Sequence, residues 1–158
     1  MNDNNARRVV SVIVVNEASV LSRITDLFSG RGYNITSLTV APIPESKYSR
    51  LTIVTSGSVR VIEQITKQLH KLIPVLRVYE HEDMVEKEMA LVKFPITENL
   101  SDINAICEAY NGKIVNVGEN VVIVMVADEP RRVDNFLNAV KRYSPKEIVR
   151  SGAVALER

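Results

Sequence analysis

The sequence predicts an α+β protein in which one βαββαβ unit is followed by a second unit of the same order. Segments rich in β-branched residues, which favour strands, alternate with segments whose apolar residues recur at the spacing of an amphipathic helix. The order of segments seen before residue 80 returns after residue 88. A chain of 158 residues is long enough for two small domains of this kind.

The first unit opens with a strand, a polar turn and a helix. Val9–Val15 is almost entirely β-branched, which favours a strand over a helix. Asn16 and Ser19 in the turn are both candidates for the N-cap of the helix, and Gly30 or Gly32 can take the left-handed conformation that ends it. The apolar stripe of this helix is Val20, Leu21, Ile24, Leu27 and Phe28.

Three more strands and one helix complete the first unit. A second strand starts at Ile35, and the loop Pro42–Lys47, with two prolines, separates it from a third strand at Leu51–Thr55. Ser58 is a candidate cap for the second helix, and Val75–Tyr79 forms the fourth strand. Right-handed βαβ crossovers then give a ferredoxin-like topology, with two helices on one face of an antiparallel sheet.

An acidic segment, Glu80–Glu88, follows the first unit, and we interpret residues 81–88 as a linker between two domains. Its carboxylates and His81 lack a defined ligand spacing, so the sequence predicts a solvated linker and no metal site. The predicted domains are residues 7–80 and residues 89–158, both ferredoxin-like.

The second unit repeats the order of the first with little similarity between residues. Its predicted elements are strands at Met89–Phe94, Lys113–Val117, Val121–Ala127 and Glu147–Arg150, helices at Ser101–Tyr110 and after Pro130, and a tail at Ser151–Arg158. Each unit alone would bury a thin core and expose sheet edges. We therefore expect the protein to form a homodimer or a higher homo-oligomer.

Composition narrows the class of protein. With 20 Lys and Arg against 19 Asp and Glu, the sequence predicts binding to neither nucleic acid nor membrane. No apolar run is long enough to span a bilayer. The polar start Met1–Ala6 lacks the features of a signal peptide, and the single Cys107 excludes an internal disulfide. We expect a cytoplasmic protein.

The sequence offers no catalytic constellation of nucleophile, base and orienting group. His70 lies in a helix beside lysines, Cys107 falls on an apolar stripe typical of a core, and His81 has no partner identifiable by spacing. The chain is therefore expected to be non-catalytic, with no metal and no cofactor of its own. RNA binding by such a sheet needs exposed aromatic residues on its central strands, and Val9–Val15 and Leu51–Thr55 contain none.

Both ends of the first helix offer polar groups to a small ligand. The turn Asn16–Ser19 presents backbone amides at a positive helix terminus, which suits a carboxylate. Asn34 places a side-chain amide next to the aliphatic Ile35. These groups together match a free aliphatic amino acid. The structural alternative is that Asn16 caps the helix and Asn34 is a turn residue tolerant of the left-handed conformation.

The run N-E-A-S-V-L-S-R-I-T-D-L-F-S-G-R-G-Y-N-I-T-S-L-T-V-A-P resembles the ACT domain that opens the small regulatory subunit of acetolactate (acetohydroxyacid) synthase. The resemblance covers nearly the whole chain, continuing at Ser49–Thr55, Glu63–Val78, Glu88–Lys93 and Val149–Leu156. It departs at Ala18-Ser19, where the family usually has Pro-Gly or Ser-Gly. Glycine in this turn lets the backbone approach a ligand closely, whereas serine adds a Cβ and a hydroxyl.

The resemblance implies a regulatory subunit for branched-chain amino-acid (valine, leucine and isoleucine) biosynthesis. Its partner would be the catalytic large subunit, which would hold the thiamine diphosphate, Mg²⁺ and FAD. This chain would activate that subunit and convey feedback inhibition, usually by valine, bound between two ACT domains. The alternative is a free-standing amino-acid sensor of the ACT family that regulates another partner. The expected effector-binding residues are Asn16, Ala18, Ser19, Val20, Leu21, Asn34 and Ile35.

Overall fold

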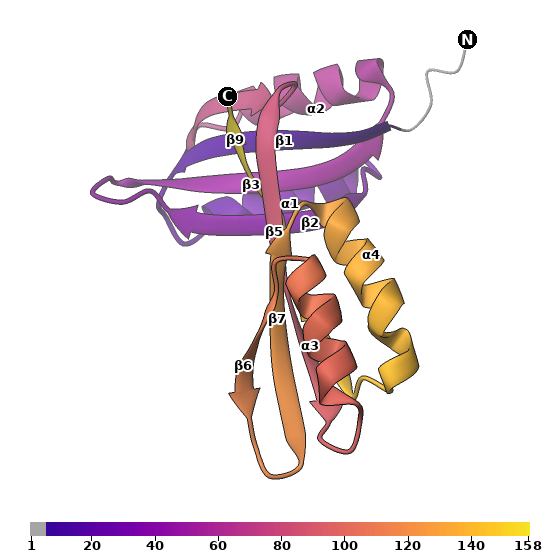
Figure 1. The fold of residues 1–158 in the computed structure, drawn as a ribbon. Helices are drawn as coiled ribbons and strands as arrows, with labels where there is room; N and C mark the ends of the chain where they lie inside the picture. Colours follow the sequence, from indigo (N-terminus) through magenta and orange to yellow (C-terminus); the bar gives the residue numbers. More distant parts are fainter. Residues whose placement is uncertain (1–5) are drawn as a thin grey trace. The chain divides into compact units, whose positions relative to one another are not determined.

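The computed structural model describes residues 6–158 and divides the chain into two compact units (Figure 1). Unit 1 runs to Val85 and also includes the C-terminal segment Ala155–Arg158, whereas unit 2 is Glu86–Val154. The chain thus leaves unit 1 and returns to it at the C-terminus. Residues 1–5, and with them most of the polar start that predicts no signal peptide, lie outside the described residues.

Unit 1 has the predicted βαββαβ order. All of its strand pairs are antiparallel, and the order across the sheet is β2-β3-β1-β4 (Figure 1). This order is ferredoxin-like, which confirms the predicted topology. It also puts β1 and β3 at the centre of the sheet, which confirms the two predicted central strands. The elements are β1 (Ala6–Val15), α1 (Val20–Gly30), β2 (Ile35–Pro42), β3 (Tyr48–Gly57), α2 (Val59–His70) and β4 (Val75–Glu80).

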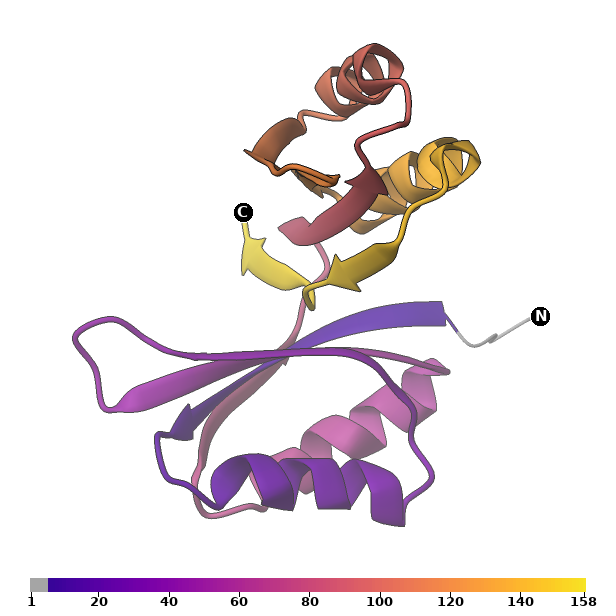
Figure 2. The same cartoon turned by 90° about the horizontal axis from the view of Figure 1, so that it is seen from below.

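Both helices of unit 1 cover the same face of its sheet (Figure 2). On that face the side chains of β1 alternate as a strand requires, with Val10, Val12 and Val14 buried among residues of the helices such as Ile24 and Phe28. Burying a side chain of this kind contributes about 1.5–3 kcal/mol. The predicted stripe of α1 is confirmed for Val20, which is also buried, and for Leu27, which packs against this core, but Leu21 is exposed.

A backbone motif ends α1 and directs the chain into β2. Gly32 has φ +68° and donates its N–H to the carbonyl of Ser29 at 3.1 Å. The N–H of Tyr33 donates to the carbonyl of Phe28 at 2.9 Å, which completes a Schellman motif. The predicted left-handed glycine is therefore Gly32.

Unit 2 has the same fold as unit 1, and the order across its sheet is β6-β7-β5-β8. Pro130 is the first residue of α4, as predicted. The strand β9 pairs with β5 outside this order. The elements are β5 (Met84–Pro95), α3 (Leu100–Ala109), β6 (Lys113–Val117), β7 (Val121–Asp128), α4 (Pro130–Val140), a 3₁₀ turn (Lys141–Tyr143), β8 (Glu147–Arg150) and β9 (Val154–Glu157).

Two segments differ from the expectations drawn from sequence. Residues 81–88 were expected to be a solvated linker, but β5 begins at Met84, and His81 and Glu88 are only 6% and 8% exposed. The expected tail after Arg150 contains the strand β9. The physical reason is that these polar side chains have partners far away in sequence, since His81 bonds to Ser11 and Glu88 to Arg150. Among residues 6–158, each helix is too short or too polar to cross a membrane.

Candidate functional site

A shallow pocket opens in unit 1 beside the turn between β1 and α1. Three of the residues predicted from sequence, Asn16, Val20 and Leu21, line it. The sequence analysis missed the other six, of which only Glu17 and Ser49 are polar. The lining residues are Val14, Val15, Asn16, Glu17, Val20, Leu21, Val40, Ser49 and Leu51. The pocket is therefore mainly aliphatic, with polar groups at the turn.

Backbone hydrogen bonds hold the turn in place. The N–H of Asn16 donates to the carbonyl of Lys47 at 3.0 Å, and that of Glu17 donates to the carbonyl of Val15 at 2.9 Å. The N–H of Val20 donates to the carbonyl of Glu17 at 3.3 Å. A helix leaves its first amides unpaired, and here their positive end remains open. In this turn and the first turn of α1, the amides of Ala18, Ser19, Leu21 and Ser22 donate to no backbone carbonyl within residues 6–158.

Side chains do not cap this helix. Ser19 occupies the N-cap position with φ −92° and ψ −6°, and its hydroxyl accepts no hydrogen bond from the helix. Asn16 and Ser19 are both exposed. The capping role considered for these two residues is therefore not found. Their side-chain oxygens accept no hydrogen bond from the start of α1.

Asn34 and Ile35 lie at the other end of α1. The helix has 11 residues and so separates the two ends by about 16 Å at about 1.5 Å per residue. The carbonyl of Asn34 accepts the hydroxyl of Thr55 at 2.5 Å, and its side chain is exposed. One chain does not bring Asn34 to the pocket at Asn16, so the predicted set of residues can form one site only if two chains contribute to it.

The opposite face of the unit 1 sheet holds a buried polar cluster that the sequence analysis missed. Ser11 Oγ lies 2.6 Å from His81 Nε2, and His81 Nδ1 lies 2.6 Å from Glu157 Oε2. Arg50 Nη2 donates to Ser11 Oγ at 3.1 Å and to the carbonyl of Ala155 at 2.7 Å. A serine, histidine and carboxylate in series can serve nucleophilic catalysis, but Ser11 lies inside β1 with 0% exposure, out of reach of a substrate.

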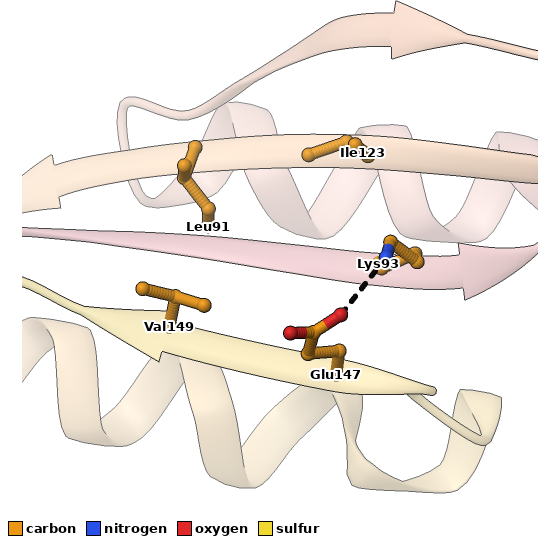
Figure 3. Close-up of a pocket in the computed structure, with 5 residues that line it drawn as sticks. All are labelled: Leu91, Lys93, Ile123, Glu147 and Val149. Atoms are coloured by element: carbon orange, nitrogen blue, oxygen red, sulfur yellow. Dashed lines mark hydrogen bonds and ion pairs between the residues drawn. The ribbon is translucent and has the colours of Figure 1, made fainter.

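Unit 2 carries a second shallow pocket, on the sheet face away from its helices (Figure 3). Leu91, Ile123 and Val149 form its apolar part. Its two charged groups bind each other, since Lys93 Nζ lies 2.8 Å from Glu147 Oε2. The hydrogen bond from Lys93 lowers the pKa of the Glu147 carboxyl. The polar groups of this pocket are therefore already paired.

The remaining chemical groups have structural positions. Cys107 is fully buried in the unit 2 core, as predicted, and burial raises the pKa of its thiol to about 11. His70 is exposed. Within residues 6–158, no group of three or more His, Cys, Asp or Glu side chains is placed to hold a metal ion. The open turn of unit 1 is therefore the candidate ligand site.

Comparison with protein families gives two matches that together cover most of the chain. Residues 10–77 match the family described as the AHAS small subunit-like ACT domain. Residues 87–158 match the family described as the small subunit of acetolactate synthase.

Curated proteins and solved structures agree with these families. The acetolactate synthase isozyme 3 small subunit of Escherichia coli is 42% identical over 156 residues, 96% of each chain. The probable acetolactate synthase small subunit of Archaeoglobus fulgidus is 36% identical and covers 96% of this chain and 97% of its own length. The crystal structure of the acetolactate synthase small subunit from Thermotoga maritima superposes with a TM-score of 0.90 at 34% identity, covering 97% of this chain and 98% of that one.

Proposed function

Because this chain belongs to the family of acetolactate synthase small subunits, we propose that it activates a catalytic large subunit and conveys feedback inhibition by valine or a related amino acid. The observation that carries the proposal is the uncapped start of α1 beside an aliphatic pocket. In this proposal thiamine diphosphate, Mg²⁺ and FAD belong to the large subunit, and this chain acts by binding its effector and its partner.

The pocket supplies what a branched-chain amino acid requires. The open amides of Ala18 and Ser19, at the positive end of α1, suit the carboxylate of the ligand. Leu21 and Val40, 38% and 44% exposed, offer an aliphatic wall to its side chain. The side-chain oxygen of Asn16 can accept a hydrogen bond from the ammonium group. Each ligand charge would thereby gain a partner, which limits the cost of removing it from water.

A second copy of the chain would complete the site. β2 is an edge strand, bonded to β3 alone in its sheet. Two copies paired antiparallel along β2 would bring the start of one strand, at Ile35, towards the end of the other, at Val40. Asn34 of one copy would then approach the pocket of its partner. The same pairing would cover an exposed sheet edge, which otherwise invites aggregation.

Regulation would follow from the position of the ligand between two copies. A ligand held by both copies favours the dimer geometry that binds it better, and it can shift the equilibrium only by its difference in affinity for the two states. The large subunit would sense that geometry. If the effector changes the affinity of this chain for the large subunit by some factor, then by linkage the large subunit changes the affinity for the effector by the same factor.

Reconstitution with the large subunit of the same organism tests this function. We expect the tagged chain to co-purify with that enzyme, to raise its activity, and to make the activity sensitive to valine. Asn16→Ala should weaken the valine response and preserve activation, whereas Asn138→Ala, an exposed asparagine on α4, is the matched control. Failure to bind or activate the large subunit, with binding to a different partner, would favour a free-standing amino-acid sensor.

A further inference from the structure

We propose that Arg50 and His81 form a latch that fastens the C-terminal residues 155–158, here called the strap, to the outer face of the unit 1 sheet. In this proposal, residues 155–158 detach from this face together when the latch opens, and the four-stranded sheet stays folded. The latch lies within unit 1, which contains both the sheet and the strap. Its inner half is part of the sheet and its outer half is carried by the strap.

The inner half of the latch is a fixed hydrogen-bonded set. Arg50 Nη2 donates to Ser11 Oγ at 3.1 Å and lies 3.4 Å from His81 Nε2. A guanidinium has only donors, so the nitrogen that faces it acts as an acceptor. The other ring nitrogen, Nδ1, faces the strap and is then the donor. The side chain of His81 has 0% exposure, so the sheet holds this orientation.

The outer half consists of two hydrogen bonds that involve charged groups. Glu157 Oε2 accepts from His81 Nδ1 at 2.6 Å, and the carbonyl of Ala155 accepts from Arg50 Nη2 at 2.7 Å. Such bonds are about twice as strong as those between neutral groups. The hydrogen bond from His81 is also the main reason that the pKa of the Glu157 carboxyl is lowered.

Apolar contacts contribute little to holding the strap. Leu156 is 65% exposed, and only Ala155, a small side chain, is buried. The ion pair between Arg158 and Asp83 joins side chains that are 60% and 71% exposed, and water screens such pairs. The remaining support is the pairing of β9 with β5, the bond from the Arg158 N–H to the Asp83 carbonyl, and a long bond of 3.4 Å from the Asp83 N–H to Glu157 Oε1. Among the side-chain contacts of the strap, the latch is therefore the one with a fully buried partner.

The latch decides how unit 2 is tethered. Unit 2 occupies the sequence between Val85 and Ala155, so a fastened strap ties both ends of its chain to unit 1. A released strap leaves one connection, at Val85. His81, the residue after β4, precedes that connection and also binds the strap.

Hydrogen exchange on the full-length chain tests the latch. Glu157 is 45% exposed, so Glu157→Ala removes its bond to His81 without disturbing the core, and it leaves the bond from Arg50 to the Ala155 carbonyl in place. We expect the exchange rate of the strap amides to rise about ten- to 150-fold, which corresponds to the stabilisation that a hydrogen bond to a charged group contributes. Exchange in β1 and β3 should not change. Glu157→Gln keeps an acceptor and should restore part of the protection.

Arg158→Ala is the matched control, because it removes an ion pair from the same strap but leaves the latch intact. We expect a change of less than about threefold, as for an exposed pair. The proposal is overturned if Arg158→Ala frees the strap as much as Glu157→Ala does. It is also overturned if Glu157→Ala leaves the strap protected, or raises exchange in β1 and β3 together with the strap.

Discussion

The two units share one fold but differ at the N-terminus of their first helix, which a side chain caps in unit 2 and not in unit 1. In unit 2 the side chain of Asn99 accepts from the N–H of Asp102 at 3.1 Å, and Asp102 adds a negative charge to the first turn of α3. In unit 1 the side chain of Ser19 makes no such bond, and the first turn of α1 has no acidic residue. A capped and acidic helix start repels an anion, whereas an open one attracts it. The cap, and not the fold, therefore distinguishes the unit for which we propose carboxylate binding from the other unit.

The units also differ in how they use buried charge. Asp128 of unit 2 is 4% exposed and is bound by Arg132 at 2.6 Å, Lys87 at 3.1 Å and the N–H of Glu129 at 2.8 Å. Burial raises the pKa of Asp128, but these three donors outweigh it and hold that pKa well below its usual range. Unit 1 has instead the His81 cluster on its sheet face. The buried carboxylate of unit 2 thus has partners within the fold of that unit, whereas the buried cluster of unit 1 binds the strap.

The largest expected effect is on Asp128. Asp128→Ala should destabilise unit 2 by about 3 kcal/mol, the low end for a broken buried ion pair, because Arg132 and Lys87 are partly exposed. Because its folded pKa is lowered, the carboxylate stabilises unit 2 fully above the unfolded pKa of about 3.9, and this stability is lost as pH falls through the folded pKa. Urea unfolding read by hydrogen exchange in each unit, from pH 7 to pH 3, checks both statements. An equal loss in unit 1, or a variant as pH-sensitive as the wild type below pH 4, would contradict them.

Much of the fold was accessible from sequence because local patterns determine it. The β-branched run of β1, the stripe of α1 and Pro130 at the start of α4 each act within a few residues. The start of β5 was not, because its polar side chains suggested a solvated linker. The strand β9 was not, because it has only four residues and its partner β5 is far away in sequence. His81 and Ser11 are 70 positions apart, and no local pattern joins them.

The candidate site was only partly accessible for a similar reason. Asn16 and Leu21 belong to the turn and helix that the sequence singled out, and they line the pocket. Val40 and Ser49 reach it from β2 and β3, whose register is a property of the whole sheet. A sequence also shows that Ser19 can cap α1, but not whether its hydroxyl does so. The cap that distinguishes the two units is therefore a finding of the structure.

Installing a cap in unit 1 should remove the difference between the units. Ser19→Asp places a carboxylate where the effector carboxylate would bind, competing for the open amides and repelling the ligand. We expect valine affinity to fall about ten- to 150-fold, the value of a lost hydrogen bond to a charged group. Isothermal titration calorimetry of the wild type and the variant measures the affinity for valine. The control is Ser101→Asp in the first turn of α3, which should leave affinity unchanged. Unchanged binding by Ser19→Asp would mean that the helix start does not hold the ligand.

Asn34→Ala tests whether the open turn of unit 1 needs a second copy. The exposed side chain of Asn34 would contribute one hydrogen bond to the effector in the partner's pocket, so its loss should weaken valine inhibition about tenfold. Activation of the large subunit should persist, because the contact of Asn34 with Thr55 uses the backbone carbonyl. Enzyme assays at increasing valine separate the two effects. Loss of assembly with an unchanged valine response in the remaining complex would make Asn34 a structural turn residue.

The smallest effect is expected for Ser19→Gly, which restores the glycine that the family usually carries in the turn. Ser19 already has φ −92° and ψ −6°, a conformation open to any residue, so serine causes no backbone strain that glycine would relieve. The hydroxyl caps nothing, and Ser→Gly at an N-cap costs only a few tenths of a kcal/mol. We therefore expect wild type and variant to respond alike, each with a rise in melting temperature of about 5–11 °C at 100 times the dissociation constant of valine. Ser101→Gly is the control. A shift that appears only in Ser19→Gly would show that the Cβ of Ser19 blocks the effector.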